Sequence, residues 1–196
     1  MHDHADQPAP SPAPSMEDEA LALLRLGFCL VPMHRPEDGG CSCNKGRGCR
    51  SVGKHPRIKS WTDNASGDET VVRGWWRRWP GANVGIATGA RSGIVVLDLD
   101  GPEGIEAAKR MAAPHGGLPR TLAVRTGGGG VHCFFRWDDA RPLGNRVALV
   151  PKVDFRGEGG CVIAPPSLHR SGRRYAWLLP EGATEPRVDQ ILPLPD

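Results

Sequence analysis

The stretch that most constrains this fold is residues 94–101, which read Ile-Val-Val-Leu-Asp-Leu-Asp-Gly. Four apolar, mostly β-branched residues predict a buried strand that runs into two carboxylates. Because side chains alternate across a strand, Asp98 and Asp100 project from one face and Leu99 from the other. Two neighbouring carboxylates repel each other unless a cation separates them, and a divalent ion such as Mg²⁺ would leave positions open for phosphate. A polar strand end that caps a turn is the alternative for an Asp-x-Asp taken alone.

The length and composition allow one well-buried core. A chain of 196 residues can form a single domain, or one domain with a small appendage. The 26 glycines and 19 prolines predict many loops and few helices, and the net charge of +3 suits a nucleic-acid partner only if the arginines cluster. Residues 1–15 lack the basic and apolar regions of a signal peptide, and no apolar run is long enough to cross a membrane. We therefore expect a cytoplasmic protein with no membrane partner.

Local patterns divide the chain into a tail, one folded domain and a second tail. Residues 1–15 form a low-complexity segment that we expect to be disordered. The domain spans residues 16–180, with the loop 39–57 inserted in it, and residues 181–196 form a C-terminal tail. Capping patterns and apolar periodicity predict helices between Ser15 and Gly27, between Ser66 and Pro80 and over 103–112, and strands over 28–31 (ended by Pro32), 83–87, 94–99, 121–126 and, as a hairpin, 153–164.

The six cysteines fall into two groups. Cys29, Cys133 and Cys161 sit singly in apolar strands, where a reduced cysteine behaves as a small hydrophobe. The other three lie in the polar loop 39–57, which has too few apolar residues to build a core. In a chain without a signal peptide, such a cluster is more often a metal site than a disulfide framework.

Three thiolates and one imidazole satisfy tetrahedral zinc as a closed, structural site. Cys41, Cys43 and Cys49 supply the thiolates, with His55 as the preferred fourth ligand and His34 as the second choice. Free thiols in a mobile loop are the alternative. The loop and its flank also carry basic residues that suit a polyanion or, equally, a solvated surface: Lys45, Arg47, Arg50, Lys54, Arg57 and Lys59.

Residues 126–130, Thr-Gly-Gly-Gly-Gly, form a turn just before Val131 and His132. Without side chains, this turn lets a phosphate or a nucleic-acid backbone approach the main-chain N–H groups. No Gly-Lys-Ser/Thr follows, which excludes a Walker loop, and the next segment is strand-like, which excludes a Rossmann fingerprint. A histidine near a strand start is usually structural, but His132 directly follows the turn and is well placed to meet an anion.

A third carboxylate lies within residues 151–167. Asp154 follows an apolar residue in a predicted strand, and Arg156, two residues on, shares its face. Alone, this pair predicts a surface or cross-strand ion pair. Together with Asp98, Asp100 and His132, it completes the residue types that two-metal phosphoryl transfer requires.

The order of these motifs resembles the archaeo-eukaryotic primase superfamily, and most closely the bifunctional DNA primase/polymerase N-terminal (prim-pol) domain. The resemblance covers residues 20–180, nearly the whole folded chain. Each motif is weak alone, but their order and spacing together are specific. The matching segments are 53–56, the helix that ends in Trp75-Trp76, 83–89, 97–102, 126–132, 153–157 and 164–167.

The resemblance implies an α+β fold in two parts, with an RRM-like catalytic half and a small zinc-binding loop. The implied activity is that of a DNA primase or polymerase, which adds nucleotides to a primer 3′ end through two Mg²⁺ or Mn²⁺ ions, with or without primer synthesis. Asp98, Asp100 and Asp154 would hold these ions. The zinc loop would be structural or would grip the template. The implied nucleotide-binding set is His132, which would contact the phosphates, with Thr126, Gly128, Gly129, Gly130, Arg156 and Lys54.

The implied partners are single-stranded or primed DNA and nucleoside triphosphates, and the chain is either a stand-alone polymerase or a catalytic piece that works with a separate helicase. The chain stops soon after Trp177, without the helical domain that supports priming in fuller members, so we expect nucleotide addition more than de novo priming. Two other classes remain open. One is a nucleic-acid- or nucleotide-binding module of the same fold with negligible turnover. The other is a phosphatase of the haloacid-dehalogenase type, although Pro102 stands where that family needs Thr or Val.

Overall fold

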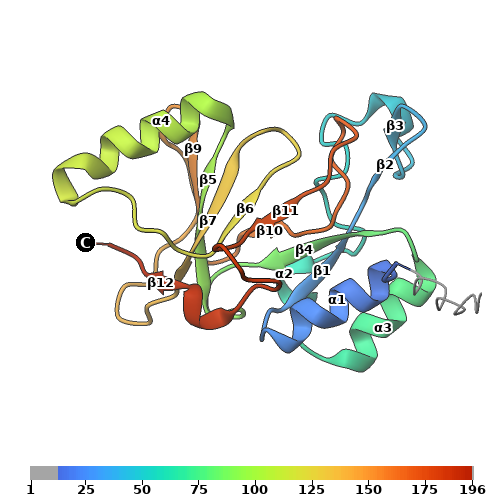
Figure 1. The fold of residues 1–196 in the computed structure, drawn as a ribbon. Helices are drawn as coiled ribbons and strands as arrows, with labels where there is room; N and C mark the ends of the chain where they lie inside the picture. Colours follow the sequence, from blue (N-terminus) through green and yellow to red (C-terminus); the bar gives the residue numbers. More distant parts are fainter. Residues whose placement is uncertain (1–12, 196) are drawn as a thin grey trace, which may run out of the picture.

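The computed structural model describes residues 13–195 and shows a mixed α+β fold (Figure 1). Its strands form a three-stranded sheet, a seven-stranded sheet and a small two-stranded sheet. The α+β class expected from the sequence is therefore confirmed. The tail predicted over residues 1–15 lies mostly outside the described residues, which begin at Ala13. Within that range, no helix has both the length and the apolar character needed to cross a bilayer.

The three-stranded sheet is covered by helices from the N-terminal part of the chain. The predicted capping box is present, because the Asp18 N–H donates to Ser15 Oγ and the Ser15 N–H donates to the Asp18 carboxylate. This reciprocal pair fixes where the first helix begins. The strands, in the order β1-β4-β10, are β1 (Leu30–Met33), β4 (Asn83–Ala87) and β10 (Cys161–Ile163), and the helices are α1 (Met16–Arg25), α2 (Trp61–Asn64) and α3 (Glu69–Arg78).

Two boundaries predicted in this region are wrong. β1 continues through Pro32, which pairs with Val84, instead of ending before it. Since β1 is an edge strand of its sheet, the missing N–H of a proline is tolerated there. The cap of α3 is Asp68, which accepts a hydrogen bond from the Val71 N–H, rather than Ser66.

The seven-stranded sheet has the order β11-β6-β7-β5-β9-β8, and β12 pairs with β7. All of these pairings are antiparallel except β12 with β7, which is parallel and joins Leu192 to Phe135. Part of the predicted C-terminal tail thus adds a strand. The strands are β5 (Ile94–Leu99), β6 (Ala123–Arg125), β7 (Val131–Arg136), β8 (Arg146–Val150), β9 (Val153–Arg156), β11 (Ala176–Leu178) and β12 (Leu192–Pro193).

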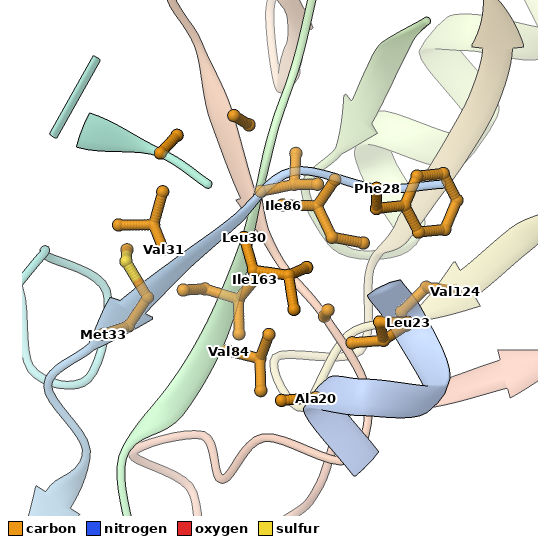
Figure 2. Packing of buried hydrophobic residues seen from close by; sticks show 14 of the residues in the cluster. Ala20, Leu23, Phe28, Leu30, Val31, Met33, Val84, Ile86, Val124 and Ile163 are labelled. Carbon is orange, nitrogen blue, oxygen red and sulfur yellow. The ribbon is translucent and has the colours of Figure 1, made fainter. Parts of the chain in front are cut away.

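The two faces of this large sheet have different neighbours. On one face, Leu97 and Phe155 belong to a core that includes Ala108 of α4 (Gly101–Ala112), and they also line an apolar cavity of about 370 Å³. On the other face, Val96 and Val124 belong to the same core as the N-terminal helices and the small sheet. Figure 2 shows Val124 of the large sheet beside Leu23 and Phe28 of the N-terminal part. The two sheets therefore share one core.

The hairpin predicted over 153–164 is wrong. β9 belongs to the large sheet, where it pairs with β5 and β8, whereas β10 pairs with β4 in the small sheet. Residues 157–160 carry the chain between the sheets, and the Thr88 hydroxyl donates to the Gly157 carbonyl at 2.6 Å. A Cβ on Gly157 would collide with the backbone of Leu143, so this crossing requires glycine.

The cysteine-bearing loop 39–57 has little regular structure. It contains β3 (Gly40–Cys41), which pairs with β2 (Pro36–Glu37), and the 3₁₀ turn η1 (Gly46–Gly48). In Figure 1 it lies beside the orange-red segment around residues 168–174, at one end of the small sheet. Two further 3₁₀ turns are η2 (Ala113–His115) and η3 (Val188–Gln190).

Candidate active site and zinc cluster

Three predicted site residues lie in one row across the large sheet. Asp98 of β5 is opposite Asp154 of β9 on one side and opposite His132 of β7 on the other. Residues directly opposite in an antiparallel pair project from the same face, so all three side chains point to the same side. We call these three residues the carboxylate row. The residues come from distant parts of the chain, and the register of three strands brings them together.

The carboxylate row is held by short polar contacts. Arg156 Nη2 lies 2.6 Å from Asp154 Oδ2 and 3.6 Å from Asp98 Oδ2, so one guanidinium faces both carboxylates. The Ala148 N–H donates to Asp154 Oδ1 at 2.7 Å. His132 Nε2 lies 3.4 Å from Asp98 Oδ1. Arg156 thus supplies the positive charge that two adjacent acids need.

These contacts affect the protonation of Asp98, whose side chain is 20% exposed. Burial alone would raise the pKa of this carboxyl, but the hydrogen bond from His132 and the charges of His132, Arg156 and Lys54 hold the pKa below its usual value. Asp98 is therefore ionised at neutral pH. His132 is buried, and its Nδ1 has no partner among residues 13–195.

Asp100 lies just beyond the end of β5, at the start of α4. It is exposed, and its side chain makes no capping hydrogen bond. The pKa of the buried Tyr175 hydroxyl is raised by burial and then by the negative charges of Asp98 and Asp100. Both carboxylates therefore lie near Tyr175, although Asp100 makes none of the close contacts that join Asp98 and Asp154.

The carboxylates fit a divalent cation by their chemistry, because Mg²⁺ and Mn²⁺ prefer oxygen ligands. The Arg156 guanidinium already contacts both Asp98 and Asp154. It therefore lies where the two carboxylates would attract a metal ion. Within residues 13–195, however, the three carboxylates do not form a group whose ligand atoms all lie within 4.8 Å of one another. The site is therefore open, with two acids adjacent and a third at its edge.

The glycine turn, residues 126–130, lies at the end of β6 and leads into His132. Some of its glycines are needed for close packing, and others leave main-chain N–H groups uncovered. A Cβ on Gly127 would collide with His169, and one on Gly130 would collide with the Leu99 carbonyl. These two positions are required by packing within the protein. A Cβ on Gly128 would meet nothing closer than 3.6 Å, and the N–H groups of Gly127 and Gly128 have no acceptor among the described residues. The turn therefore retains free main-chain donors.

Lys54 and Arg156 were both predicted to help bind nucleotide. Lys54 is exposed at the end of the cysteine loop, and its charge acts on both Asp98 and His169. Arg156 instead contacts the acids directly. Three further residues near these side chains were not among the predicted site residues: His169, Tyr175 and Asn83. The basic run around His169, just before Tyr175, was the signal that could have drawn attention to this segment.

The cysteine loop brings Cys41, Cys43, Cys49 and His55 together, with one ligand atom from each lying within 4.8 Å of all the others. His55 Nε2 lies 3.5 Å from the Sγ atoms of both Cys41 and Cys49. Zn–S and Zn–N bonds of about 2.3 and 2.0 Å at a tetrahedral angle place sulfur and nitrogen roughly 3.6 Å apart, so the donors fit zinc. All six cysteines are free thiols.

His34, the second choice for the fourth ligand, lies beside the cluster rather than in it. Its ring stacks on that of His55 with centroids 4.4 Å apart, and its Nδ1 is 3.0 Å from Ser42 Oγ. Ser42 Oγ also accepts a hydrogen bond from Arg57 Nη2 at 2.8 Å. His34 and Arg57 thus support the loop from outside the ligand set.

Comparison with known proteins agrees with this arrangement. The family model described as bifunctional DNA primase/polymerase, N-terminal (Prim-Pol), matches residues 20–196. A search of curated protein sequences gave no match. Because the family match spans most of the chain, the protein belongs to the Prim-Pol family and is a primase/polymerase-type domain.

Proposed function

We propose that this domain is a template-directed nucleotidyltransferase that adds nucleotides to the 3′ end of a DNA primer by two-metal-ion catalysis. The carboxylate row carries the proposal, because it places Asp98, Asp154 and His132 on one face of adjacent strands. The family match supports DNA and nucleoside triphosphates as substrates. Primer synthesis from nucleotides alone and a separate helicase partner are further proposals that follow from the resemblance.

In this proposal, Asp98, Asp100 and Asp154 hold the divalent ions. The ions would activate the primer 3′-hydroxyl as the nucleophile and neutralise charge on the leaving pyrophosphate. Asp98 suits a ligand role because its low pKa keeps it ionised. The Ala148 N–H fixes the orientation of the Asp154 carboxylate, so one acid of the pair is already in place.

The groups around the acids suit the phosphates of a nucleotide. Thr126 Oγ1 accepts a hydrogen bond from the Gly130 N–H, which holds the glycine turn closed. Gly128 is exposed and Gly127 is buried, so the turn presents the free N–H group of Gly128. His132 lies between this turn and Asp98, and Arg156 lies on the far side of Asp98. Anionic phosphates would thus meet donors on one side and ion-bound carboxylates on the other.

The test is primer extension with a labelled deoxynucleoside triphosphate on a primed template, in Mg²⁺ and in Mn²⁺. We expect extension by the unaltered chain and none after removal of divalent ions with a chelator. Asp98→Ala and Asp154→Ala should each lower the rate by more than about 100-fold, the upper end of effects from residues that only support a metal ligand. The matched control is Asp189→Ala, which removes an exposed acid paired with Arg187. Unchanged extension by Asp154→Ala would contradict the proposal.

One observation favours a second candidate, a nucleotide- or nucleic-acid-binding module with weak turnover. The three carboxylates do not close into one group among residues 13–195, and Arg156 lies between two of them. Such a module would bind primed DNA or nucleotide and show no metal-dependent extension. The phosphatase alternative receives no support from the family match.

A further inference from the structure

The segment 168–174 folds back over the glycine turn as a small hairpin, which we call the His169 hairpin. Leu168 and Arg174 form a bridge at its base, and the His169 N–H donates to the Arg173 carbonyl at 2.8 Å. Ser171 Oγ and Arg173 Nε both donate to the Gly127 carbonyl, at 2.8 and 2.9 Å. Two side chains of the hairpin therefore fix its position on the turn.

His169 directs one ring nitrogen toward the open part of this turn. His169 Nδ1 lies 3.0 Å from Ser171 Oγ and 3.2 Å from the Ser171 nitrogen, so Ser171 contacts one ring nitrogen and leaves Nε2 as the nitrogen that can meet a ligand. Nε2 lies 3.7 Å, and Cε1 3.6 Å, from the position of a Cβ on Gly128. The ring is thus next to the glycine whose N–H is free. An imidazole nitrogen and an exposed main-chain donor therefore meet at one place.

The charges around His169 are positive. Burial lowers the pKa of its imidazole, and the charges of Lys54, Arg170 and Arg173 lower it further. Three cations whose charges act on one histidine beside an open turn are an arrangement that attracts an anion. Lys54 also acts on Asp98, so the basic group adjoins the carboxylate row.

Asn83, which is 2% exposed, links the segments that carry Lys54 and His169. Its Nδ2 donates to the carbonyls of Gly53, at 3.2 Å, and Leu168, at 2.8 Å, and its Oδ1 accepts from the Leu168 N–H at 2.9 Å. Gly53 and Leu168 immediately precede Lys54 and His169. One buried amide thus sets the spacing between the two basic residues.

We propose that His169 binds the polyphosphate of the incoming nucleotide, together with Lys54 and the free N–H group of Gly128 in the glycine turn. Asn83 is the positioning residue that holds the two basic side chains at the required separation. The inference rests on the proposed function, because it assigns the phosphate end of that nucleotide site. A DNA backbone phosphate would offer similar chemistry, and the experiment distinguishes the two sources.

The experiment measures equilibrium binding of dATP, dAMP and inorganic tripolyphosphate in Mn²⁺ without DNA, and binding of primed DNA separately. We expect His169→Ala to weaken dATP and tripolyphosphate by about 10-fold or more, as for a lost hydrogen bond to a charged group, and to leave dAMP and DNA unchanged. His169→Gln keeps an N–H donor and should recover part of the affinity. His115→Ala, at an exposed histidine after α4, is the matched control.

Asn83→Ala tests the positioning role. Because buried partners lose their hydrogen bonds, this variant should be less stable, so the diagnostic quantity is the ratio of dATP to dAMP affinity in the folded fraction. We expect this ratio to fall, whereas a purely structural role would leave it unchanged and would overturn the role of Asn83.

Equal dATP affinity in His169→Ala and His115→Ala would overturn the assignment of His169 while leaving the proposed function intact. Loss of DNA binding with unchanged dATP binding would also overturn it, in favour of a backbone phosphate. Failure of the unaltered chain to bind dATP or tripolyphosphate would reject both this inference and the proposed function.

Discussion

The two candidate metal centres differ in how the chain assembles them. The zinc cluster consists of Cys41, Cys43, Cys49 and His55. All four lie within residues 41–55, and one donor atom from each lies within 4.8 Å of the others. The carboxylate row takes its members from three strands, and an arginine lies between two of the acids. A closed soft-ligand cluster is typical of a structural metal, whereas an open oxygen site is typical of a catalytic one. The comparison therefore predicts a metal that stabilises the fold at one centre and ions that bind with substrate at the other.

The largest expected effect comes from removing zinc. Cys49→Ser or strong chelation should abolish zinc binding and unfold the 39–57 loop, because structural zinc contributes on the order of 10 kcal/mol to small zinc domains. Zinc content by atomic absorption and limited proteolysis measure this. Asp98→Asn should show the opposite behaviour, with zinc content and protease resistance unchanged. A protease-resistant loop in the zinc-free protein would remove the distinction between the two centres.

Arg156 provides a smaller and sharper test. If its guanidinium competes with divalent ions for Asp98 and Asp154, Arg156→Gln should tighten Mn²⁺ binding in the absence of nucleotide. A lost contact to a charged group corresponds to about 10-fold in affinity. Calorimetric titration with Mn²⁺ measures it, with Arg187→Gln as a control at an exposed ion pair. Weaker Mn²⁺ binding in Arg156→Gln would show that the arginine supports the ion rather than replacing it.

The smallest effect concerns thiol reactivity. Burial raises the pKa of Cys133 and Cys161 to about 11, so at pH 8 their thiols are almost entirely protonated and react slowly. Alkylation of these two cysteines should accelerate as pH rises toward 11. The three loop cysteines should react only after zinc is removed. Peptide mapping after iodoacetamide treatment at several pH values measures the alkylation of both groups of cysteines. Fast labelling of Cys133 in the folded protein at pH 8 would contradict the raised pKa of its thiol.

The sequence predicted which side chains gather at the two candidate centres better than it predicted their surroundings. Alternation along a strand placed Asp98 on a polar face, and cysteine spacing selected the zinc ligands with His55, because both are local properties of the chain. The zinc ligand set is supported by its geometry, while the roles of the acids stay predictions. The pairing of the strands was predicted wrongly at one point, because β9 and β10 are close in sequence but lie in different sheets.

The contacts that the sequence did not reveal are long-range. Between β9 and β10, Gly157 packs closely against the Leu143 backbone, a contact that no local pattern reports. Asn83 reads as an ordinary strand residue, yet its amide joins segments that precede Lys54 and His169. His169 lies just beyond the matching segment 164–167, and its place beside Gly128 appears only once the hairpin folds over the turn.

The glycine crossing between the sheets has a consequence for how this sequence can vary. Gly157 follows Arg156 directly, and no side chain fits there without moving the Leu143 backbone. The backbone displacement that a methyl group causes at this position would thus reach the Asp154–Arg156 ion pair, although Gly157 itself has no functional side chain. We therefore expect Gly157 to tolerate substitution as poorly as Asp154, although a glycine has no side chain to contribute to the site.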